Sequence, residues 1–346
     1  MSCRFECAFL VTLLVARGLV AGDYVFSVAG DQVLLNGKTF KVLGLRCSNA
    51  LTSDVTTQQL IDHLQVYKSY GINTVSAFFM GSRFGDVKGF EVDGSLNPIY
   101  AARMGRIIEA ADRLGMVVLV GCLYWSTSRA KEDLVDVWGQ DDANRAVANT
   151  VRWLTDNEYH NVFVDVDNEG MAHDQMDWSI AAMIEAAHGV DPSIMVAYND
   201  GDPVPSNADL CIHHSPKVKG KPWLESEGTP KNAAGGYWGE FSKEAHRATG
   251  GSYYNYSRIG RYTVEMKQDD CRQTDENVRN FNGHMLASTW LQCAPNESVG
   301  GPFVKPRGHS NIEDVDADID ELHPDAGILW WLEYVKARYG AWVPPK

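Results

Sequence analysis

Short apolar patterns typical of β-strands alternate with helical patterns along most of the chain, in one repeating order. This order favours a parallel sheet, because a helix between two strands lets the second strand run in the same direction as the first. Eight such units close into a (β/α)8 barrel, the TIM barrel, which is the predicted fold. An open doubly wound sheet is the alternative, but no Gly-rich phosphate turn follows the first strand. The predicted strands are 40–46, 73–80, 116–125, 161–168, 194–199, 208–214, 222–227 and 284–290.

A β-hairpin is predicted before the first barrel strand, because Asn36-Gly37 lies between two apolar runs. No low-complexity linker or change of composition follows, so residues 22–346 are predicted to form one domain. The predicted helices are 57–70, 99–114, 142–155, 178–188, 237–248 and 328–339.

The N-terminus has the pattern of a secretory signal peptide. Arg4 precedes an apolar run over 7–16, and small residues follow up to Ala21-Gly22. Residues 1–21 are therefore predicted to be a signal peptide cleaved after Ala21, with Ala16 as the alternative, and the protein to be secreted or periplasmic. The run is too short to span a bilayer, and no later segment is apolar enough to do so.

Charge and cysteine content narrow the classes of partner and the redox chemistry. The formal net charge of −14 argues against nucleic acid and anionic membranes as partners, because both select basic surfaces. Removal of the signal peptide leaves five of the seven cysteines, so at least one thiol is free. Cys271 and Cys293 are the pair considered for a disulfide.

Carboxylates stand at the ends of two predicted strands. Val162, Val164 and Val166 alternate with other residues up to Asn168-Glu169, where Gly170 ends the strand. The seventh strand carries Glu225 and Glu227, which have the same parity, so alternation does not choose between them.

The carboxyl ends of barrel strands meet at one mouth, and there the sequence brings together acids, imidazoles, amides and indoles. Glycosidic cleavage needs two carboxyl groups beside the bond, one protonated and one ionised. The acid must keep its proton near neutral pH, so its pKa should be raised. Aromatic faces stack on sugar rings, while polar side chains bond the hydroxyls. The side chains expected at the mouth are Arg46, Asn49, Phe79, Tyr124, Trp125, Asn168, Glu169, Asn199, His213, His214, Glu225, Glu227 and Trp290.

Two motifs resemble clan A glycoside hydrolases. Residues 162–170 resemble that clan's fourth strand, whose Asn-Glu carries the acid/base, and 221–228 resemble its seventh, whose Ser-Glu carries the nucleophile. The resemblance therefore selects Glu227 over Glu225. Within the clan the chain is most similar to glycoside hydrolase family 5 over about residues 30–295. The further motifs lie at 41–46, 71–75, 209–213 and 287–290.

The sequence departs from the family pattern at three positions, one of which is the end of the third strand, where Tyr124-Trp125 stands and a His is common. Ser76 stands where the second strand normally ends in an Arg, and Arg46 or Arg83 could supply the guanidinium. Ser215 stands where a Tyr usually follows the sixth-strand His, and Tyr254 or Tyr256 could replace it. These differences indicate a divergent member.

The resemblance implies a retaining β-glycosidase that acts on an oligo- or polysaccharide by double displacement, without a cofactor. Glu169 would be the acid/base and Glu227 the nucleophile, while Asn168 would bond the sugar 2-hydroxyl. A carbohydrate-binding barrel with impaired catalysis and a transglycosylase are the alternatives. No metal is expected, because the adjacent His213 and His214 should point to opposite sides of a strand. The remaining substrate contacts are predicted to be Arg46, Asn49, Trp125, His213, Tyr256 and Trp290.

Overall fold

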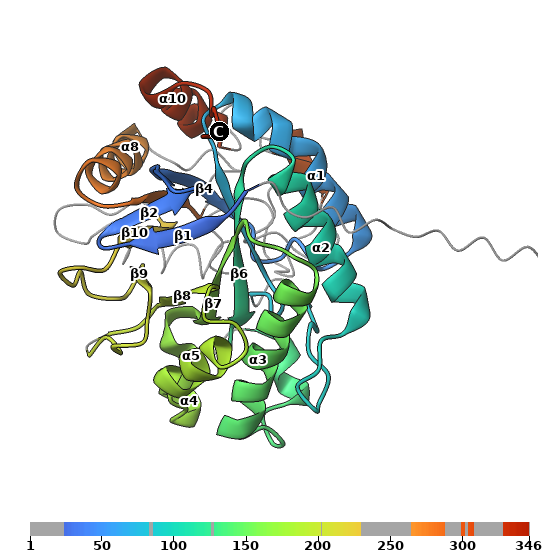
Figure 1. Cartoon of the computed structure of the whole chain (residues 1–346). Helices are drawn as coiled ribbons and strands as arrows, with labels where there is room; N and C mark the ends of the chain where they lie inside the picture. The colour runs from blue at the N-terminus through green and yellow to red at the C-terminus, as the bar shows by residue number, and fades with distance from the viewer. Residues whose placement is uncertain are drawn as a thin grey trace, which may run out of the picture.

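The computed structural model describes residues 24–82, 86–125, 128–201, 203–229, 264–287, 299–301, 304–307 and 328–345. Its centre is a closed barrel of eight parallel strands, which confirms the predicted fold (Figure 1). All eight strands are buried along their length apart from the first residue of β8, because side chains fill the barrel and helices cover its outside. The strands are β4 (Val42–Arg46), β5 (Thr74–Phe78), β6 (Val117–Leu123), β7 (Val162–Asp167), β8 (Met195–Tyr198), β9 (Leu210–Ile212), β10 (Trp223–Gly228) and β11 (Gly283–Leu286).

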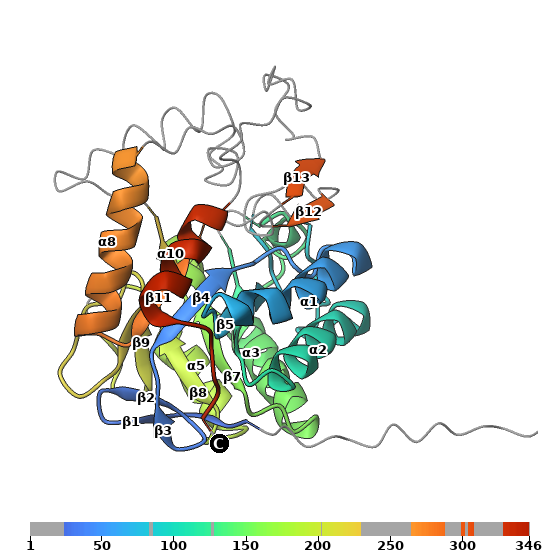
Figure 2. The same ribbon diagram turned by 90° about the horizontal axis from the view of Figure 1, so that it is seen from above.

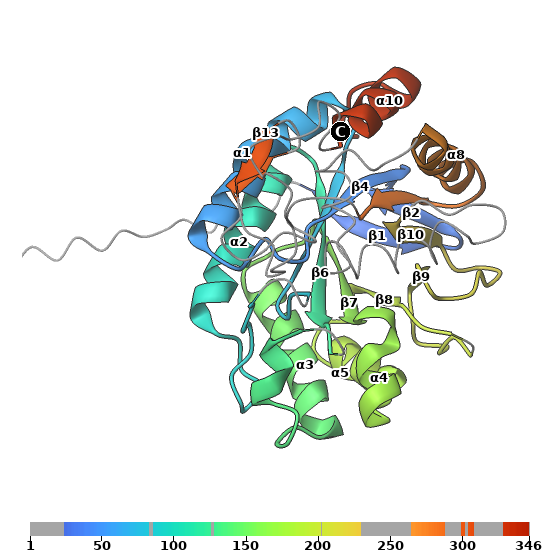
Figure 3. The same cartoon turned by 180° about the vertical axis from the view of Figure 1, so that it is seen from behind.

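Helices surround the ring of strands, and α3 packs beside α5 (Figures 1 and 3). Their ends follow local capping chemistry: Ser53 and Thr56 form a capping box at the start of α1, and Asn97 caps α2 ahead of Pro98. The helices are α1 (Asp54–Ser69), α2 (Pro98–Asp112), α3 (Gln140–Asp156), α4 (Met171–Met176), α5 (Ile180–His188), α8 (Val264–Asn280) and α10 (Leu329–Tyr339), with the 3-10 turns η1 (Ala130–Asp133) and η2 (Asn168–Gly170).

Two regions differ from the sequence prediction. The α8 helix was not predicted, because its sequence is mostly polar and lacks a clear apolar stripe. The predicted helix at 237–248 lies outside the described residues. The predicted eighth strand at 284–290 corresponds to β11, which ends at Leu286, and residues 288–290 lie outside the described part.

The predicted hairpin is present: β2 (Gln32–Leu35) and β3 (Lys38–Thr39) pair across the Asn36-Gly37 turn. A further strand, β1 (Phe26–Ala29), pairs with β2, and the resulting three-stranded N-terminal sheet covers one end of the barrel. In Figure 2 it lies at the opposite end of the molecule from β12 (Val299–Gly301) and β13 (Val304–Arg307).

Aromatic packing fixes this N-terminal sheet to the barrel. The Phe26 ring stacks on Phe163 of β7, with 4.9 Å between centroids. Asn282 ties the hairpin to β11, because its side chain accepts from the Val33 amide at 3.2 Å and donates to the Asp31 carbonyl at 2.9 Å. In the described structure the N-terminal sheet therefore covers one end of the barrel, and the carboxyl ends of the barrel strands lie at the other end (Figure 2).

Among the described helices, none has the length and apolar character that crossing a bilayer requires. Cys271 is a free thiol in the described structure, and its predicted partner Cys293 lies outside it.

We expect Phe26→Ala to lower the free energy of unfolding by about 3–5 kcal/mol, because it empties a buried aromatic site beneath the barrel. Urea unfolding measures the loss. Val25→Ala is the control, since Val25 is exposed and its removal should change stability by less than about 0.5 kcal/mol. Equal losses of unfolding free energy in the two variants would show that the N-terminal sheet does not stabilise the barrel.

Candidate active site

The predicted acid, Glu169, lies on a strained turn at the end of β7. Its backbone is left-handed (φ 55°, ψ 26°), and Gly170 after it is also left-handed (φ 63°). A side chain at Gly170 is excluded, because a Cβ there would lie 2.4 Å from Asp200 Cγ. Asp167 anchors the far side of the turn by accepting from the amides of Ala172 and His173, each at 2.9 Å. A non-glycine residue in this conformation costs about 1–2 kcal/mol, a kind of strain that is concentrated at functional sites.

Arg46 holds the predicted nucleophile. Its Nη2 lies 3.2 Å from Glu227 Oε2 and also donates to Asn168 Oδ1. The guanidinium is fully buried over the rings of Phe78 and Tyr124, 5.0 Å and 5.6 Å from their centroids.

The register of the barrel places Arg46 beside the position where the family arginine is absent. Arg46 of β4 lies opposite Ser76 of β5. Of the two arginines considered from sequence, Arg46 is the one paired with Glu227, and Arg83 lies outside the described residues.

The carboxyls of Glu169 and Glu227 each shift the pKa of the other. Burial, the largest effect, raises the pKa of Glu227 to about 8; the charge of Arg46 opposes this rise and that of Glu169 adds to it. Burial also acts upward on the pKa of Glu169, but His213, Glu227 and Arg46 outweigh it and lower that pKa. Carboxyls coupled in this way titrate as a pair, so they share one proton near neutral pH.

The two histidines correct one sequence prediction. They do not point to opposite sides, because β9 ends at Ile212 and His213 is left-handed (φ 43°), outside the strand geometry on which that argument rested. Their rings stack with 4.2 Å between centroids. His214 Nε2 lies 3.9 Å from Glu169 Oε2, while His213 Nδ1 bonds Glu225 Oε1 at 2.5 Å.

Glu169, His213 and His214 could hold a divalent cation. One ligand atom from each lies within 4.8 Å of the others, and two imidazoles with a carboxylate are donors that zinc prefers. The same carboxylate is the predicted acid/base, so a cation bound there would take Glu169 away from a substrate. The sequence prediction of no metal rested on the strand geometry corrected above.

The other residues that were predicted to contact the substrate lie in different surroundings. Asn49 is buried and donates to Ser82 Oγ at 2.7 Å. Trp125 is fully buried, stacked on Trp138 and edge-on to Trp178 at 4.7 Å. The expectation that Trp125 offers its face to a sugar is therefore not met. Tyr256 and Trp290 lie outside the described residues and stay predictions.

Three further residues lie near the pair. Tyr124 and Glu225 were expected at the mouth without an assigned role: Tyr124 lies under Arg46, and Glu225 accepts from the Glu227 amide at 2.9 Å. Asp165 was not predicted; it lies inside the barrel and accepts from Asn199 at 3.0 Å. The available signal for Asp165 was an acidic residue between Val164 and Val166 of the strand.

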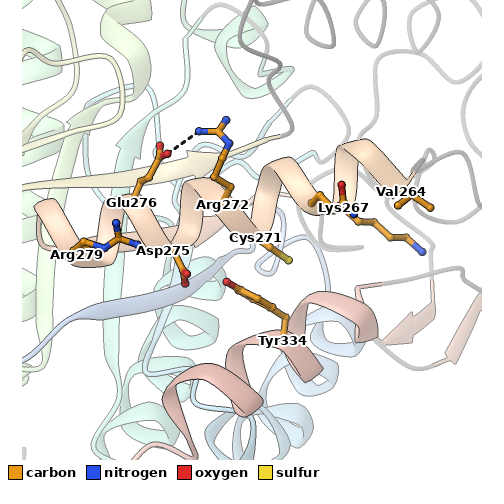
Figure 4. Close-up of a pocket in the computed structure, with 9 residues that line it drawn as sticks. Val264, Lys267, Cys271, Arg272, Asp275, Glu276, Arg279 and Tyr334 are labelled. Carbon is orange, nitrogen blue, oxygen red and sulfur yellow. Dashed lines mark hydrogen bonds and ion pairs between the residues drawn. The ribbon is translucent and has the colours of Figure 1, made fainter.

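A groove of about 670 Å³ lies between α8 and α10, away from the mouth (Figure 4). Charges of both signs line it, and Arg272 bonds Glu276 at 2.9 Å within it. Burial raises the pKa of the Cys271 thiol to about 12, so this thiol is not a reactive thiolate. The groove lacks the paired carboxyls that make the barrel mouth the candidate site.

We expect Arg46→Met to lower the free energy of unfolding by about 3–5 kcal/mol, because it leaves a buried carboxyl pair without its cation. Adding Glu227→Gln should recover part of this loss, and a double-mutant cycle by urea unfolding measures the coupling. Arg106→Met is the matched control, since its exposed pair with Asp54 is worth at most about 1 kcal/mol. If Arg46→Met lowers the free energy of unfolding no more than Arg106→Met does, the pair of Arg46 and Glu227 does not stabilise the fold.

Stability should fall as the pH rises from about 4 to 8. Burial raises the pKa of Asp165 to about 6 and that of Asp167 to about 8, and Glu227 behaves likewise. The folded state therefore binds these protons more tightly than the unfolded state does. The stability that this binding confers is fully present below the pKa values of the unfolded state, and it is lost as the pH rises through the pKa values of the folded state.

Urea unfolding at pH 5 and pH 8 tests this expectation. Asp167→Asn keeps an oxygen for the α4 amides but does not titrate, so it should narrow the difference between the two pH values. Asp62→Asn, on the exposed side of α1, should leave the difference unchanged. A wild-type protein equally stable at both pH values would contradict the raised pKa values.

Neither a protein-family model nor a curated protein matches this sequence. Solved glycoside hydrolase structures do match. The family 5 mannosidase from Rhizomucor miehei, in complex with mannosyl-fructose, is 11% identical with a TM-score of 0.54, and the match covers 93% of this chain and 99% of that one. An endocellulase from Pyrococcus horikoshii, in complex with cellotetraose, is 14% identical with a TM-score of 0.51, and coverage is 92% and 99%.

A family 5 glycoside hydrolase from Bacteroides vulgatus is 14% identical with a TM-score of 0.52. That match covers 77% of this chain and 63% of the Bacteroides protein, so the chain spans less than two thirds of that protein's length. At these identities the likeness establishes the fold. The chain therefore has the barrel of glycoside hydrolase family 5 structures, and the predicted resemblance is confirmed at that level.

Proposed function

We propose that the protein is a retaining glycoside hydrolase that cleaves β-linked oligo- or polysaccharides, with Glu169 as acid/base and Glu227 as nucleophile. The observation that carries this proposal is the pair of carboxyls at the barrel mouth, with Glu227 buried beside Arg46 and Glu169 partly buried, each of which shifts the pKa of the other. Inverting enzymes keep their carboxyls about 6.5–9.5 Å apart to admit a water, whereas retaining enzymes keep them about 5–5.5 Å apart. Carboxyls that act on each other's protonation favour the shorter separation and therefore retention.

The shared proton suggests how the pair starts the reaction. In the free protein the raised pKa of Glu227 and the lowered pKa of Glu169 place the proton on Glu227. When a sugar enters between the carboxyls, the charge of Arg46 favours the ionised form of Glu227 and the proton passes to Glu169, which gives it to the leaving oxygen while Glu227 attacks the anomeric carbon.

The second half of the reaction uses the same groups in reverse. Glu169, now ionised, takes a proton from water, and the resulting attack releases the sugar from Glu227. Asn168 donates from Nδ2 to Glu169 Oε1 at 3.3 Å, and that donor is the one we assign to the sugar 2-hydroxyl.

The substrate class follows from the residues and from the related barrels. The matched structures include proteins named as a mannosidase and an endocellulase, one holding mannosyl-fructose and the other cellotetraose. We propose β-mannosides and β-glucosides as the first substrates to test. Export through a signal peptide at 1–21, and one catalytic domain over 22–346, remain part of this proposal.

The alternatives differ in what they do with the bound sugar. A binding barrel was suggested by Ser76 and Ser215, but Arg46 now fills the role that Ser76 leaves open, which weakens that alternative. A transglycosylase would use the same carboxyls but pass the sugar to another sugar, so its rate would rise with added acceptor.

We expect Glu169→Ala and Glu227→Ala to lose at least about a thousandfold in kcat/KM on soluble β-mannan or β-glucan. Glu333→Ala, on the exposed side of α10, is the control and should match wild type. Azide separates the two roles on an activated aryl β-glycoside. It should give an inverted glycosyl azide with Glu227→Ala and a retained one with Glu169→Ala.

Other outcomes decide among the alternatives. A wild-type protein that hydrolyses no glycoside, yet melts at higher temperature with a glycan, would be a binding barrel. A wild-type product with inverted anomeric configuration, followed by NMR, would overturn the retaining assignment.

A further inference from the structure

The side chains of Glu169, His213 and His214 have the spacing of a site for a transition metal ion. One ligand atom from each lies within 4.8 Å of the other two, and His214 Nε2 lies 3.9 Å from Glu169 Oε2. Bond lengths of about 2.0–2.1 Å place the donors around a tetrahedral zinc ion about 3.3–3.5 Å apart. Shifts of about an ångström would bring the three donors to that spacing. The His214 side chain is 52% exposed, so its ring has room to move.

We propose that Glu169, His213 and His214 bind a zinc ion, and that the bound ion inhibits the protein by engaging its acid/base. The binding stands on the arrangement of the three side chains. The inhibition rests on the proposed function, which gives Glu169 that role. None of the catalytic steps above uses the ion, so its effect is regulatory.

Glu225 prepares His213 to be a ligand. Its Oε1 accepts from His213 Nδ1 at 2.5 Å and from the Glu227 amide at 2.9 Å, and its side chain is buried. With the ring hydrogen on Nδ1, the lone pair lies on Nε2, which is the nitrogen that a metal would bind. A carboxylate behind the far nitrogen is the usual outer partner of a metal-bound histidine, because it fixes the ring and raises its basicity. Glu225 therefore has the place of an outer partner to a metal site.

The turn after β9 brings the two imidazoles together. His213 is left-handed (φ 43°), and its amide donates to the Leu224 carbonyl at 3.1 Å. The rings of His213 and His214 stack with 4.2 Å between centroids, on the side of the mouth where Glu169 Oε2 lies. The other oxygen of Glu169, Oε1, accepts from Asn168 at 3.3 Å. The ion would thus bind Oε2.

Charge and access favour a cation at this place. The carboxyls of Glu169, Glu225 and Glu227 all act on the His213 ring, while the Arg46 guanidinium is engaged by Glu227. The chain as a whole carries a formal net charge of −14. Glu169 is partly exposed and His214 is exposed, so an ion can enter from solvent.

The donor set favours zinc and predicts what the ion would do. Zinc binds two imidazoles and a carboxylate and keeps a fourth position for water, whereas calcium and magnesium prefer oxygen donors. A Glu169 oxygen bonded to zinc neither gives a proton to the leaving oxygen nor takes one from water. Hydrolysis should therefore stop while the ion is bound.

Titration calorimetry with zinc chloride, on protein treated with EDTA and then dialysed, tests the site. We expect wild type to bind an ion that depends on His214. His214→Gln should weaken that binding at least about tenfold, because loss of an outer partner alone costs about 10–100-fold. Glu169→Gln should weaken it likewise, which ties the ion to the acid/base.

His188→Gln is the matched control. His188 Nε2 also lies beside a carboxylate, Asp209 Oδ2 at 2.9 Å, but in the part of the chain that the structure describes no third ligand completes a site there. This variant should bind zinc as wild type does.

The inhibition is measured on soluble β-mannan or β-glucan. Zinc chloride should stop hydrolysis by wild type, EDTA should restore it, and magnesium chloride at the same concentration should have no effect. In His214→Gln the zinc concentration that halves the rate, relative to that variant's own zinc-free rate, should rise by the same factor as the dissociation constant.

Three results would overturn the proposal. If wild type binds no zinc, or His214→Gln binds it as tightly as wild type, the three side chains are not the site. If Glu169→Gln keeps the wild-type affinity, the ion does not engage the acid/base. If zinc binds through His214 but leaves the rate unchanged or raises it, the ion is not an inhibitor. A wild type that hydrolyses no glycoside without zinc would contradict the proposed function, while the titrations would still decide whether the site binds zinc.

Discussion

The contact between Arg46 and Glu227 is the interaction on which the site depends. A guanidinium buried completely inside a barrel is costly unless carboxylates and hydrogen-bond acceptors surround it. Here one nitrogen reaches Glu227 and Asn168 together, and aromatic rings lie against the guanidinium. The same cation therefore orients Glu227 and fixes the Asn168 amide next to Glu169.

The rigidity of the barrel lets the mouth keep conformations that a free peptide would avoid. Glu169 and His213 are both left-handed, although neither is a glycine. Each is held by hydrogen bonds to a neighbouring strand or turn, through Asp167 in the first case and Leu224 in the second. The stability needed to hold them comes from elsewhere, including the Phe26–Phe163 stack that closes the other end of the barrel.

Much of this architecture could be predicted from the sequence, because it depends on local patterns. The strand and helix periods indicated the barrel, and Asn36-Gly37 indicated the hairpin, since turn chemistry and apolar spacing act over a few residues. The α8 helix escaped prediction because its sequence is mostly polar, and only Met266 and Val278 among its buried residues are apolar. In the fold it packs against β10, β11 and α10.

The sequence by itself determined which strand ends carry carboxylates, amides and imidazoles, since a parallel barrel brings all its carboxyl ends to one mouth. Only the tertiary structure decided how they pair. The register of β4 against β5 placed Arg46 beside Ser76, and the end of β9 turned His213 toward Glu225 and stacked it on His214. Sequence parity could not show this, because it holds only while the chain stays in a strand. Pairing and burial also set the proton affinities, since both depend on which charges the fold brings together.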